Sequence, residues 1–544
     1  DHGIFNDKMG ECTKDPGGYF IVNGSEKVLV SAERPAENQP MVYTESNPPS
    51  VDVKSIPCGK SVRPRPFQLK LIRTPTGDNV IRVFIPQVRQ NIPLFTVMLA
   101  LDIKSDYQVF SELLLDLSPK LVMIQADQLL RSSLLDNTAT NKESAMEFIS
   151  RHVSSFGAAD LIDPKLTGAL HHAHNLVKRA TTVEEQQQAI KQRNIIDKEK
   201  RIKFTEEILK NELLPHVGSS TLKKRLYIGY LFRNLVYNVY TKQPNSDRDS
   251  FCKKRVNASG ALLTQLFSQN YTRLIREIKT NINKAFTKGS WKADGNFHNI
   301  IKKDILYQYI RSSILTKAIR TALSTGNLGA KGTTNLVGIA QVLNRLSFNG
   351  TVSHLRRVVA PLTNSGKLLK PRALHPTQFF TICCAESPEG QQCGLVKNLA
   401  LATIITLYTD PTVRKNILIK IGCLPIDDNI SYDKLKTYAH IFVDGEFWGI
   451  TNKCQYVIDQ LRYQRKLGNI HPHTSIIWDR SKSAIATSTS MGIIKLNGTG
   501  GRLIRPMYII NNNRFLVTQE HIDYIKKGGH FDSMICPSLA TDRP

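Results

Sequence analysis

The residues whose chemistry is easiest to interpret lie in and just after a long stretch without acidic side chains. Between Ile305 and Ala385 the sequence contains no Asp or Glu, yet it contains ten Lys and Arg residues. A stretch of this length has no local counter-charge, so it must face an anion or be neutralised by another part of the assembly. Its last part holds Ser-His-Leu-Arg-Arg at 353–357, and Ala-Glu-Ser-Pro-Glu-Gly-Gln follows at 385–391.

The basic side chains near the end of this stretch could bind phosphate. Adjacent residues of an extended segment point to opposite faces, so one of Arg356 and Arg357 can be buried while the other faces a ligand. The planar guanidinium fork suits phosphate oxygens. Lys367 and Lys370 follow an Asn-Ser-Gly turn, from which long side chains could reach a phosphate backbone. On spacing alone, phosphate binding and simple surface charge remain equal alternatives.

The acidic residues of the motif region point to a structural role. Glu386 and Glu389 are the only acids there, and they lie among Pro and Gly in a turn-like segment. We expect them to pair with Arg356, Arg357 or Arg372 and to fix the loop, in preference to binding a metal ion. Phosphoryl transfer by two metal ions requires clustered carboxylates, and the sequence contains no suitable group of Asp residues.

Other catalytic or metal-binding patterns are absent from the sequence. His354 and His375 have no partner at ligand spacing, so we interpret both as structural. The nine cysteines include no Cys-x-x-Cys pair, so no zinc ribbon is predicted, and they suggest reduced thiols in an intracellular compartment. Spacing reveals no Ser/His/Asp set. The glycines at 498–501 indicate a turn, because the Gly-Lys-Ser/Thr of a phosphate-binding loop is missing.

Bulk composition favours a polyanionic partner. The 544 residues, enough for three to four domains by a rough prior, carry a net charge of +27. Nucleic acid is the first candidate partner, an anionic membrane is the second, and a generically basic intracellular protein is the alternative. No apolar run reaches the ~18 residues of a membrane span, and there is no secretory signal. The sequence starts with Asp1 in ordered-looking sequence, so we expect a piece of a longer protein.

Two tight turns punctuate the predicted strands. Residues 19–22 and 28–30 read as strands around Asn23-Gly24, and residues 441–450 read as two strands around Asp444-Gly445. Both dipeptides accept the positive φ angles that a hairpin turn needs. Further strands are expected at 68–72 and 80–85, and on both sides of the glycines at 498–501.

Helical patterns dominate from about 106 to 238. One helix is expected from 186 to 214, ending before Pro215, and another from about 261 to 288 with an apolar stripe that we expect to be core. A shorter helix is expected near 455–466. Lys253-Lys254-Arg255 either belongs to a linker with local ion pairs or ends a hinge that touches phosphates.

Several segments resemble one family. Residues 338–345 (Gly-Ile-Ala-Gln-Val-Leu-Asn-Arg), 353–357 and 385–398 closely resemble the second-largest subunit of multisubunit DNA-dependent RNA polymerases. The resemblance is closer to the eukaryotic and archaeal type than to the bacterial beta subunit. Residues 17–30, 247–255, 325–327 and 501–506 also resemble that family, in family order.

The resemblance implies a multidomain α+β architecture. It divides the chain at family boundaries: 1–40 as part of the protrusion, 41–255 as the lobe, 256–330 as the return of the protrusion, 331–412 as the fork, 413–505 as external 1, and 506–544 as the start of external 2. The match corresponds to the N-terminal half of the family, without its first segment. The C-terminal half of the same subunit is therefore an expected partner.

The resemblance also implies roles for individual residues. Lys27, Gln341, Arg357 and Gln391 match family residues along the RNA–DNA hybrid. Lys367 and Lys370 match the fork loop beside downstream DNA, and Arg356 is counted with these nucleic-acid contacts. Arg372, Glu386 and Glu389 are expected to shape the loop. Family enzymes hold catalytic Mg²⁺ with an aspartate triad in the largest subunit, so no catalytic residue, metal ligand or zinc site is expected in this chain.

The expected function is therefore that of a subunit of a DNA-directed RNA polymerase, inactive alone. Its partners would be the largest and smaller polymerase subunits, template DNA and transcript RNA, in the nucleus, or in the cytoplasm or virion if the protein is viral. The alternative is a non-catalytic nucleic-acid-binding scaffold or a naturally split subunit. A membrane-surface protein is disfavoured, because no amphipathic helix pairs a basic face with exposed Trp or Phe. Ser387, where the family usually has Thr, and unusual sequence at 328–337 and 358–365 suggest a divergent lineage, with a large DNA virus and a microbial eukaryote both open.

Overall fold

The described part of the chain forms two compact units. The computed structural model describes residues 12, 14–57, 59, 64–115, 117–153, 169, 177, 183–288, 310–311, 313–328, 337–362, 368–427, 430–507, 510–511, 513–515 and 517–528. The first unit comprises Asp1–Ala36, Arg248–Leu407 and Gly500–Met507. The second comprises Glu37–Asp247, Tyr408–Thr499 and Tyr508–Pro544. Each unit is therefore assembled from segments that are distant in sequence.

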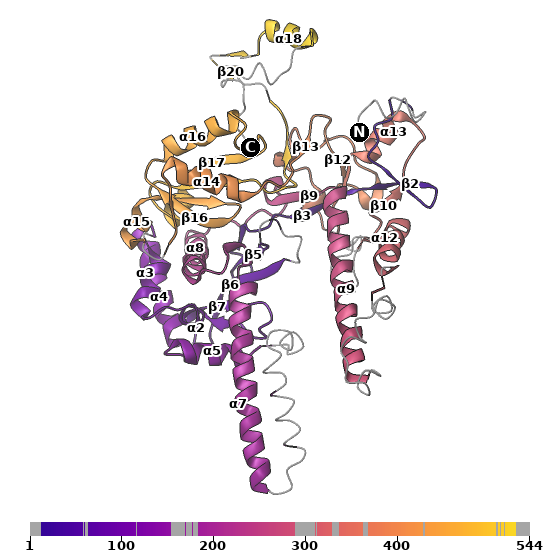
Figure 1. Ribbon diagram of the computed structural model, residues 1–544. Helices are drawn as coiled ribbons and strands as arrows, with labels where there is room; N and C mark the ends of the chain where they lie inside the picture. The colour runs from indigo at the N-terminus through magenta and orange to yellow at the C-terminus, as the bar shows by residue number, and fades with distance from the viewer. Residues whose placement is uncertain are drawn as a thin grey trace. The chain divides into compact units, whose positions relative to one another are not determined.

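Short sheets from distant segments form the centre of the first unit (Figure 1). An antiparallel sheet has the order β1-β2-β10, and its strands are Phe20–Val22, Ser25–Leu29 and Ala340–Val342. A mixed sheet has the order β12-β11-β3-β9, and its strands are Val396–Asn398, Arg357–Val359, Ser31–Pro35 and Lys254–Asn257. β11 runs parallel to β3, and the other pairs are antiparallel. The pair β13 (Ile404–Ile405) and β19 (Leu503–Ile504) completes the described strands.

The helices of the first unit support these sheets. They are α9 (Ser259–Lys288), α12 (Ser313–Thr325) and α13 (Phe348–Leu355), with short 3-10 turns η4 (Phe251–Lys253), η6 (Lys370–Arg372), η7 (Pro376–Gln378) and η8 (Gly390–Gln392). The predicted helix at 261–288 is confirmed, and its Leu262 and Leu266 join a core with Leu29 and Leu323. Its apolar stripe is only partly core. Phe267 and Ile275, which directly follow the buried Leu266 and Leu274, remain exposed.

The second unit contains two five-stranded sheets. The first is an antiparallel meander, β4-β5-β6-β7-β8, with strands Pro40–Tyr43, Ser50–Ser55, Arg65–Arg73, Asn79–Phe84 and Ile92–Pro93. The second has the order β14-β16-β15-β18-β17, with strands Leu424–Pro425, Glu446–Thr451, Ala439–Val443, Ile493–Asn497 and Ser475–Asp479. β15 and β18 are parallel, which no local pattern predicts. A short pair, β20 (Ile510–Asn511) and β21 (Arg514–Phe515), follows.

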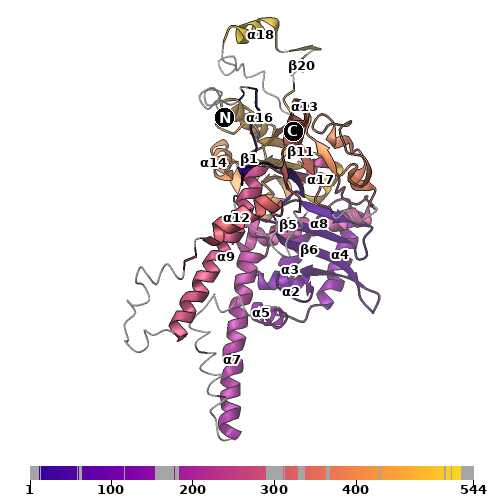
Figure 2. The ribbon, with the colours of Figure 1, turned by 90° about the vertical axis from the view of Figure 1, so that its right-hand side faces the viewer.

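Helices pack against both sheets of the second unit, and Figure 2 shows several of them beside the first sheet. Those of the first segment are α2 (Leu94–Ala100), α3 (Asp106–Leu114), α4 (Lys120–Leu135), α5 (Lys142–Arg151), α7 (Val183–Glu207) and α8 (Thr221–Tyr240), with the π-helical turn η2 (Ile208–Glu212) and the 3-10 turn η3 (Pro215–Val217). Those of the later segments are α14 (Pro411–Ile421), α15 (Tyr432–Thr437), α16 (Cys454–Lys466), α17 (Lys482–Thr487) and α18 (Gln519–Lys526). None of the described helices is long and apolar enough to cross a membrane.

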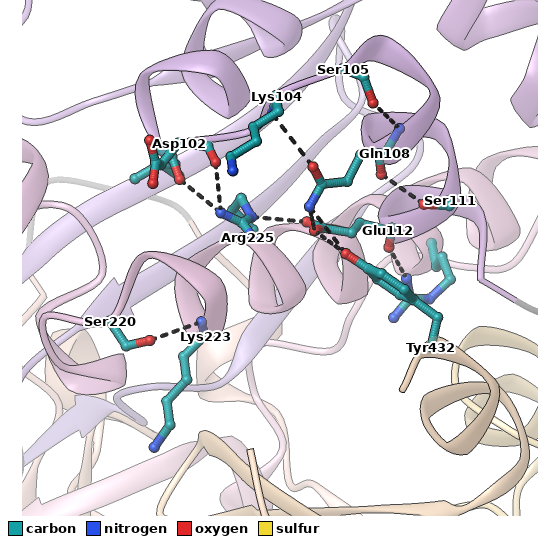
Figure 3. Close-up of polar contacts among 12 residues, drawn as sticks. Asp102, Lys104, Ser105, Gln108, Ser111, Glu112, Ser220, Lys223, Arg225 and Tyr432 are labelled. Atoms are coloured by element: carbon teal, nitrogen blue, oxygen red, sulfur yellow. Dashed lines mark hydrogen bonds and ion pairs between the residues drawn. The ribbon is translucent and has the colours of Figure 1, made fainter. Parts of the chain in front are cut away.

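A buried carboxylate joins the two main segments of the second unit (Figure 3). Glu112 of α3 is fully buried, and its oxygens accept hydrogen bonds from Arg225 Nε of α8 at 3.1 Å and from Tyr432 Oη at 2.8 Å. Gln108 also donates to Glu112 at 3.1 Å. A buried charge is stable only when it is paired and hydrogen-bonded in this way, so the contact fixes α15 against α3 and α8.

The predicted fold class and both predicted hairpin turns are confirmed. Helices combine with antiparallel and mixed sheets, as the α+β class requires. Asn23 and Gly24 have φ angles of 50° and 77°, and Asp444 and Gly445 have 51° and 90°. These are the positive values for which each dipeptide was identified.

Candidate nucleic-acid interface

A cleft of about 840 Å³ in the first unit brings together residues from three separate segments. Its lining includes Gln341 of β10, Arg357 at the start of β11, and Glu386. The rest of its lining comes from residues 337–339, 359–362, 387–388, 392, 395–396 and 398. Two of the predicted nucleic-acid contacts, Gln341 and Arg357, therefore share one concave surface with a predicted loop-shaping acid.

The end of α13 sends the two adjacent arginines in different directions. Ser347 caps the start of the helix by accepting a hydrogen bond from Gly350 N, and the helix ends at Leu355. Arg356 is the C-cap residue, and Arg357 begins β11, where it pairs with Asn398. The polypeptide thus changes from helix to strand between these two side chains.

Arg356 anchors the scaffold, whereas Arg357 faces the cleft. Arg356 Nη2 donates to the carbonyl oxygens of Ala400 at 2.6 Å, Leu401 at 3.2 Å and Thr403 at 3.3 Å. Arg357 lines the cleft, and its buried Nε has no hydrogen-bond partner among the described residues. One arginine is thus structural and the other available, but not through the expected alternation, because Arg356 ends a helix and does not lie on an extended segment. The anchoring contacts differ from the nucleic-acid contact expected of Arg356.

Gln341 is held by a short chain of hydrogen bonds. Its Nε2 donates to Gly338 O at 3.0 Å, and its Oε1 lies 2.9 Å from His354 Nε2. His354 Nδ1 accepts from Asn344 N at 3.1 Å. Burial, and then the nearby charge of Arg357, lower the pKa of His354. His354 is therefore a buried neutral histidine in contact with the cleft residue Gln341.

The loop around Glu386 is fixed by contacts other than the expected ion pairs. No ion pair joins Glu386 or Glu389 to Arg356, Arg357 or Arg372 within the described ranges. Glu386 instead accepts a hydrogen bond from the Ser353 hydroxyl. The expected pairing was wrong because the guanidinium groups of two of these arginines are directed to backbone carbonyl oxygens.

Arg372 holds the loop through such carbonyl oxygens. Its Nη1 donates to Gln391 O at 2.6 Å and to Cys393 O at 2.9 Å. Gly394 must be glycine here, because it has a φ of +72° and a Cβ would lie 2.2 Å from Arg372 O. The close approach of the two backbones explains why the motif has glycine at position 394.

The remaining predicted contacts lie elsewhere. Lys27 is half-buried on β2, opposite Val342 of β10. Lys370 in η6 and Gln391 in η8 are exposed. None of these side chains is among those that line the cleft. Lys367 lies outside the described residues.

The acid-free stretch is neutralised at one position by acids from outside it. Arg345 Nε lies 2.8 Å from Glu26, its Nη2 lies 3.2 Å from Asp15, and its guanidinium stacks on Tyr19. The hydrogen bond from Arg345 lowers the pKa of Glu26. Within the described ranges no carboxylate pairs with the other cations of the stretch, namely Arg311, Lys317, Arg320, Arg356, Arg357, Lys370 and Arg372. At these seven positions the positive charge is therefore still available to an anion from outside the described part of the chain.

Sequence reasoning missed a buried ion cluster beside this surface. Glu33 of β3 lies 2.9 Å from Lys397 of β12 and 3.2 Å from Lys254 of β9. Both ammonium groups also lie over the ring of Phe251. Residues 253–255 were expected to form either local ion pairs or a hinge that touches phosphates. For Lys254, the structure shows the ion pair. Arg255 is buried and donates to Lys254 O at 2.8 Å.

Within the described ranges, no group of three or more His, Cys, Asp or Glu side chains could hold a metal ion. The chemistry that the cleft offers is hydrogen bonding and positive charge. Such groups bind phosphate and sugar oxygens without reading base sequence.

Comparison with protein-family models gives three matches in chain order. Residues 7–308 match the RNA polymerase beta subunit, residues 341–405 match RNA polymerase Rpb2, domain 3, and residues 441–511 match RNA polymerase Rpb2, domain 4. The cleft residues fall within the second match and just before it. The first match alone covers more than half of the 544 residues.

Curated relatives come from eukaryotes, archaea and a virus. DNA-directed RNA polymerase II subunit RPB2 of Encephalitozoon cuniculi is 31% identical over 531 residues, 96% of this chain and 40% of the relative. DNA-directed RNA polymerase subunit 2 of Acanthamoeba polyphaga mimivirus is 28% identical over 546 residues, 96% of this chain and 40% of the relative. DNA-directed RNA polymerase subunit Rpo2N of Methanothermobacter thermautotrophicus is 30% identical over 432 residues, 77% of this chain and 74% of the relative. The chain thus spans about 40% of the length of the first two.

Proposed function

Because this chain belongs to the Rpb2 family of RNA polymerase beta subunits, we propose that it forms part of the second-largest subunit of a DNA-directed RNA polymerase. Its contribution is to line the path of the template–transcript hybrid during templated RNA synthesis. The observation that carries this proposal is the cleft, where Gln341 and Arg357 converge and Arg357 has no carboxylate partner among the described residues.

The chemistry of these side chains suits a moving polymer. A guanidinium fork neutralises phosphate, and an amide can donate to sugar or phosphate oxygens. Neither group distinguishes one base sequence from another, and a polymerase must translocate on any sequence. Lys27, Lys370 and Gln391, together with Lys367, extend the proposed contacts along the nucleic acid. Arg356 supports this surface through its carbonyl contacts.

The domain names follow from the same proposal. The first unit corresponds to the protrusion and fork, and the second to the lobe and external domains. Its support is that the boundaries after Ala36, Asp247 and Leu407 lie close to those expected at 40, 255 and 412. The assembly would add the largest subunit, which would hold catalytic Mg²⁺, the smaller subunits, and the remainder of the second-largest subunit. It would work inside a cell, in the nucleus, or in the cytoplasm or a virion if viral.

Replacing Arg357 tests the proposal in the assembled polymerase. Arg357→Ala should lower the elongation rate by about ten-fold or more, because a hydrogen bond to a charged group contributes roughly 1.5–3 kcal/mol. The melting temperature should stay within about 2 °C, since no described carboxylate loses a partner. Arg357→Lys keeps the charge without the fork and should fall between.

A matched control separates this site from general loss of charge. Arg131 of α4 is a highly exposed arginine that does not line the cleft, and among the described residues its ion-pair partner is Asp127, one turn away. Arg131→Ala should leave elongation unchanged. Normal elongation by the Arg357→Ala enzyme would contradict the proposed role of the cleft.

A further inference from the structure

We infer that His354 is a positioning residue that sets the orientation of the Gln341 amide toward the nucleic acid, an inference that rests on the proposed function. His354 lies on α13 and is 4% exposed, whereas Gln341 lies on β10 and lines the cleft. The two side chains meet at 2.9 Å between His354 Nε2 and Gln341 Oε1. His354 therefore contacts the cleft only through another side chain.

The hydrogen-bond network assigns the tautomer of His354. Asn344 N–H can only donate, so the Nδ1 that accepts it at 3.1 Å carries no hydrogen. Nε2 must then carry the hydrogen of the neutral ring and donate it to Gln341 Oε1. In an imidazolium, Nδ1 would also carry a hydrogen, and two N–H donors would then face each other at the contact with Asn344. The positive Arg357 beside the ring disfavours that form further.

This network determines which end of the Gln341 amide remains for a ligand. Oε1 is occupied by His354, and one Nε2 hydrogen is occupied by Gly338 O at 3.0 Å. The second Nε2 hydrogen is left as a donor. Phosphate and sugar oxygens are acceptors, so a donor is the group they require. Without His354, only the contact with Gly338 O would oppose a 180° rotation of the amide, which exchanges its donor and acceptor ends.

If the role of His354 were purely structural, a different hydrogen bond of its ring would matter. In that case the important contact is the one from Asn344 N, which connects α13 to the end of β10, and Gln341 would only fill a hydrogen-bonding need of the ring. The two roles use different nitrogens of one imidazole. Substitutions that preserve one nitrogen position at a time can therefore separate them.

Asparagine and glutamine provide these substitutions. The amide oxygen of Asn lies near the position of Nδ1, so His354→Asn can still accept from Asn344 but cannot donate to Gln341. The amide nitrogen of Gln lies near the position of Nε2, so His354→Gln can still donate to Gln341. Positioning predicts that His354→Asn weakens binding of an RNA–DNA hybrid scaffold by about three- to ten-fold, the loss expected for one hydrogen bond. His354→Gln should recover most of that loss.

The decisive measurement is fluorescence anisotropy of a labelled hybrid scaffold bound to the assembled polymerase, with the melting temperature measured in parallel. If His354 acts through Gln341, His354→Asn adds no loss of affinity in a Gln341→Ala background. Equal effects of His354→Asn and His354→Gln, or additive effects with Gln341→Ala, would overturn the inference. If Arg357→Ala weakens binding while His354→Asn does not, the inference fails and the proposed function stands. If neither Arg357→Ala nor Gln341→Ala weakens binding, the proposed function fails first.

Discussion

At the scale of single residues, Gly498 shows how strongly a position can depend on the absence of a side chain. Arg414 and Asp444 form an ion pair with exposures of 2% and 0%, and Gly498 N donates to Asp444 Oδ1 at 2.6 Å. A Cβ at Gly498 would lie 1.2 Å from Arg414 Nη1. The guanidinium of Arg414 therefore occupies the space that the Cβ of any other residue at 498 would need.

Gly498→Ala should separate Arg414 from Asp444. Leaving a buried charge without its partner costs about 3–5 kcal/mol, so the free energy of unfolding of the second unit should fall by about this amount. Urea unfolding followed by tryptophan fluorescence measures it, because Trp448 and Trp478 lie in the sheet beside this pair. Gly260→Ala, in the first turn of α9, is the control: a Cβ there meets nothing within 4 Å, so the same measurement should show no loss of stability. A Gly498→Ala protein as stable as the parent would show that Arg414 can move aside.

At the scale of elements, the sequence predicted those features that depend on neighbouring residues. The turns at Asn23-Gly24 and Asp444-Gly445, and the helix α9, follow from dipeptide conformation and apolar spacing. The contacts that failed to be predicted join distant segments. Glu33 meets Lys397, 364 residues away, because β3 and β12 both flank β11. Strand order is not encoded in local spacing, so neither this cluster nor the pairing of His354 with Gln341 could be deduced.

The same limit applies to the candidate site. Composition indicated that the acid-free stretch needs a counter-charge, and spacing indicated that Arg356 and Arg357 could differ, although by alternation along a strand and not by the helix end that the structure has. Neither could reveal that Arg345 finds Glu26 and Asp15, because that contact depends on β10 lying beside β2.

The β14–β18 sheet of the second unit should be destabilised by acid through His440 of β15. His440 is fully buried, its Nε2 lies 3.0 Å from Leu435 O, and its Nδ1 has no partner among the described residues. Burial, aided by the charge of Arg233, lowers the pKa of His440 to about 3, against about 6.5 when unfolded. The folded state therefore resists protonation where the unfolded state accepts it. The contribution of neutral His440 to stability is therefore fully present well above pH 6.5 and is lost as the pH decreases toward 3, by up to about 1.4 kcal/mol per pH unit.

His440→Phe should lower the slope of the free energy of unfolding against pH by the amount that corresponds to nearly one bound proton. The phenyl ring is somewhat larger than the imidazole but keeps an aromatic contact with Phe447, whose ring centroid lies 4.5 Å from that of His440, and it does not titrate. The measurement is the free energy of unfolding between pH 7 and pH 5, where the slope, and not the absolute value, is the result. His471→Phe, at an exposed position, should leave the slope unchanged. An unaltered slope in His440→Phe would mean that other groups, such as buried His216, account for acid sensitivity.

At the scale of the whole molecule, the net charge favours binding of nucleic acid, whereas the described residues offer no group for catalysis of nucleotidyl transfer. A charge of +27 attracts polyanions regardless of sequence. Yet the described residues contain no carboxylate cluster that could hold the metal ions of nucleotidyl transfer. The chain also spans only 40% of the length of its RPB2 relative from Encephalitozoon cuniculi. Binding and catalysis should therefore separate when this chain is studied alone.

The purified chain should bind an RNA–DNA hybrid in a strongly salt-dependent way and should make no RNA. Neutralising about four phosphates, the number of cations proposed here at Lys27, Arg357, Lys367 and Lys370, would lower affinity roughly a hundred-fold between 50 and 200 mM salt. Arg357→Ala should reduce the slope of log affinity against log salt concentration by about one phosphate, whereas Arg131→Ala should leave it unchanged. Incorporation of labelled nucleotides with Mg²⁺ present tests catalysis on the same samples. RNA synthesis by this chain alone would require a metal site on it and would overturn the assignment of catalytic Mg²⁺ to the largest subunit.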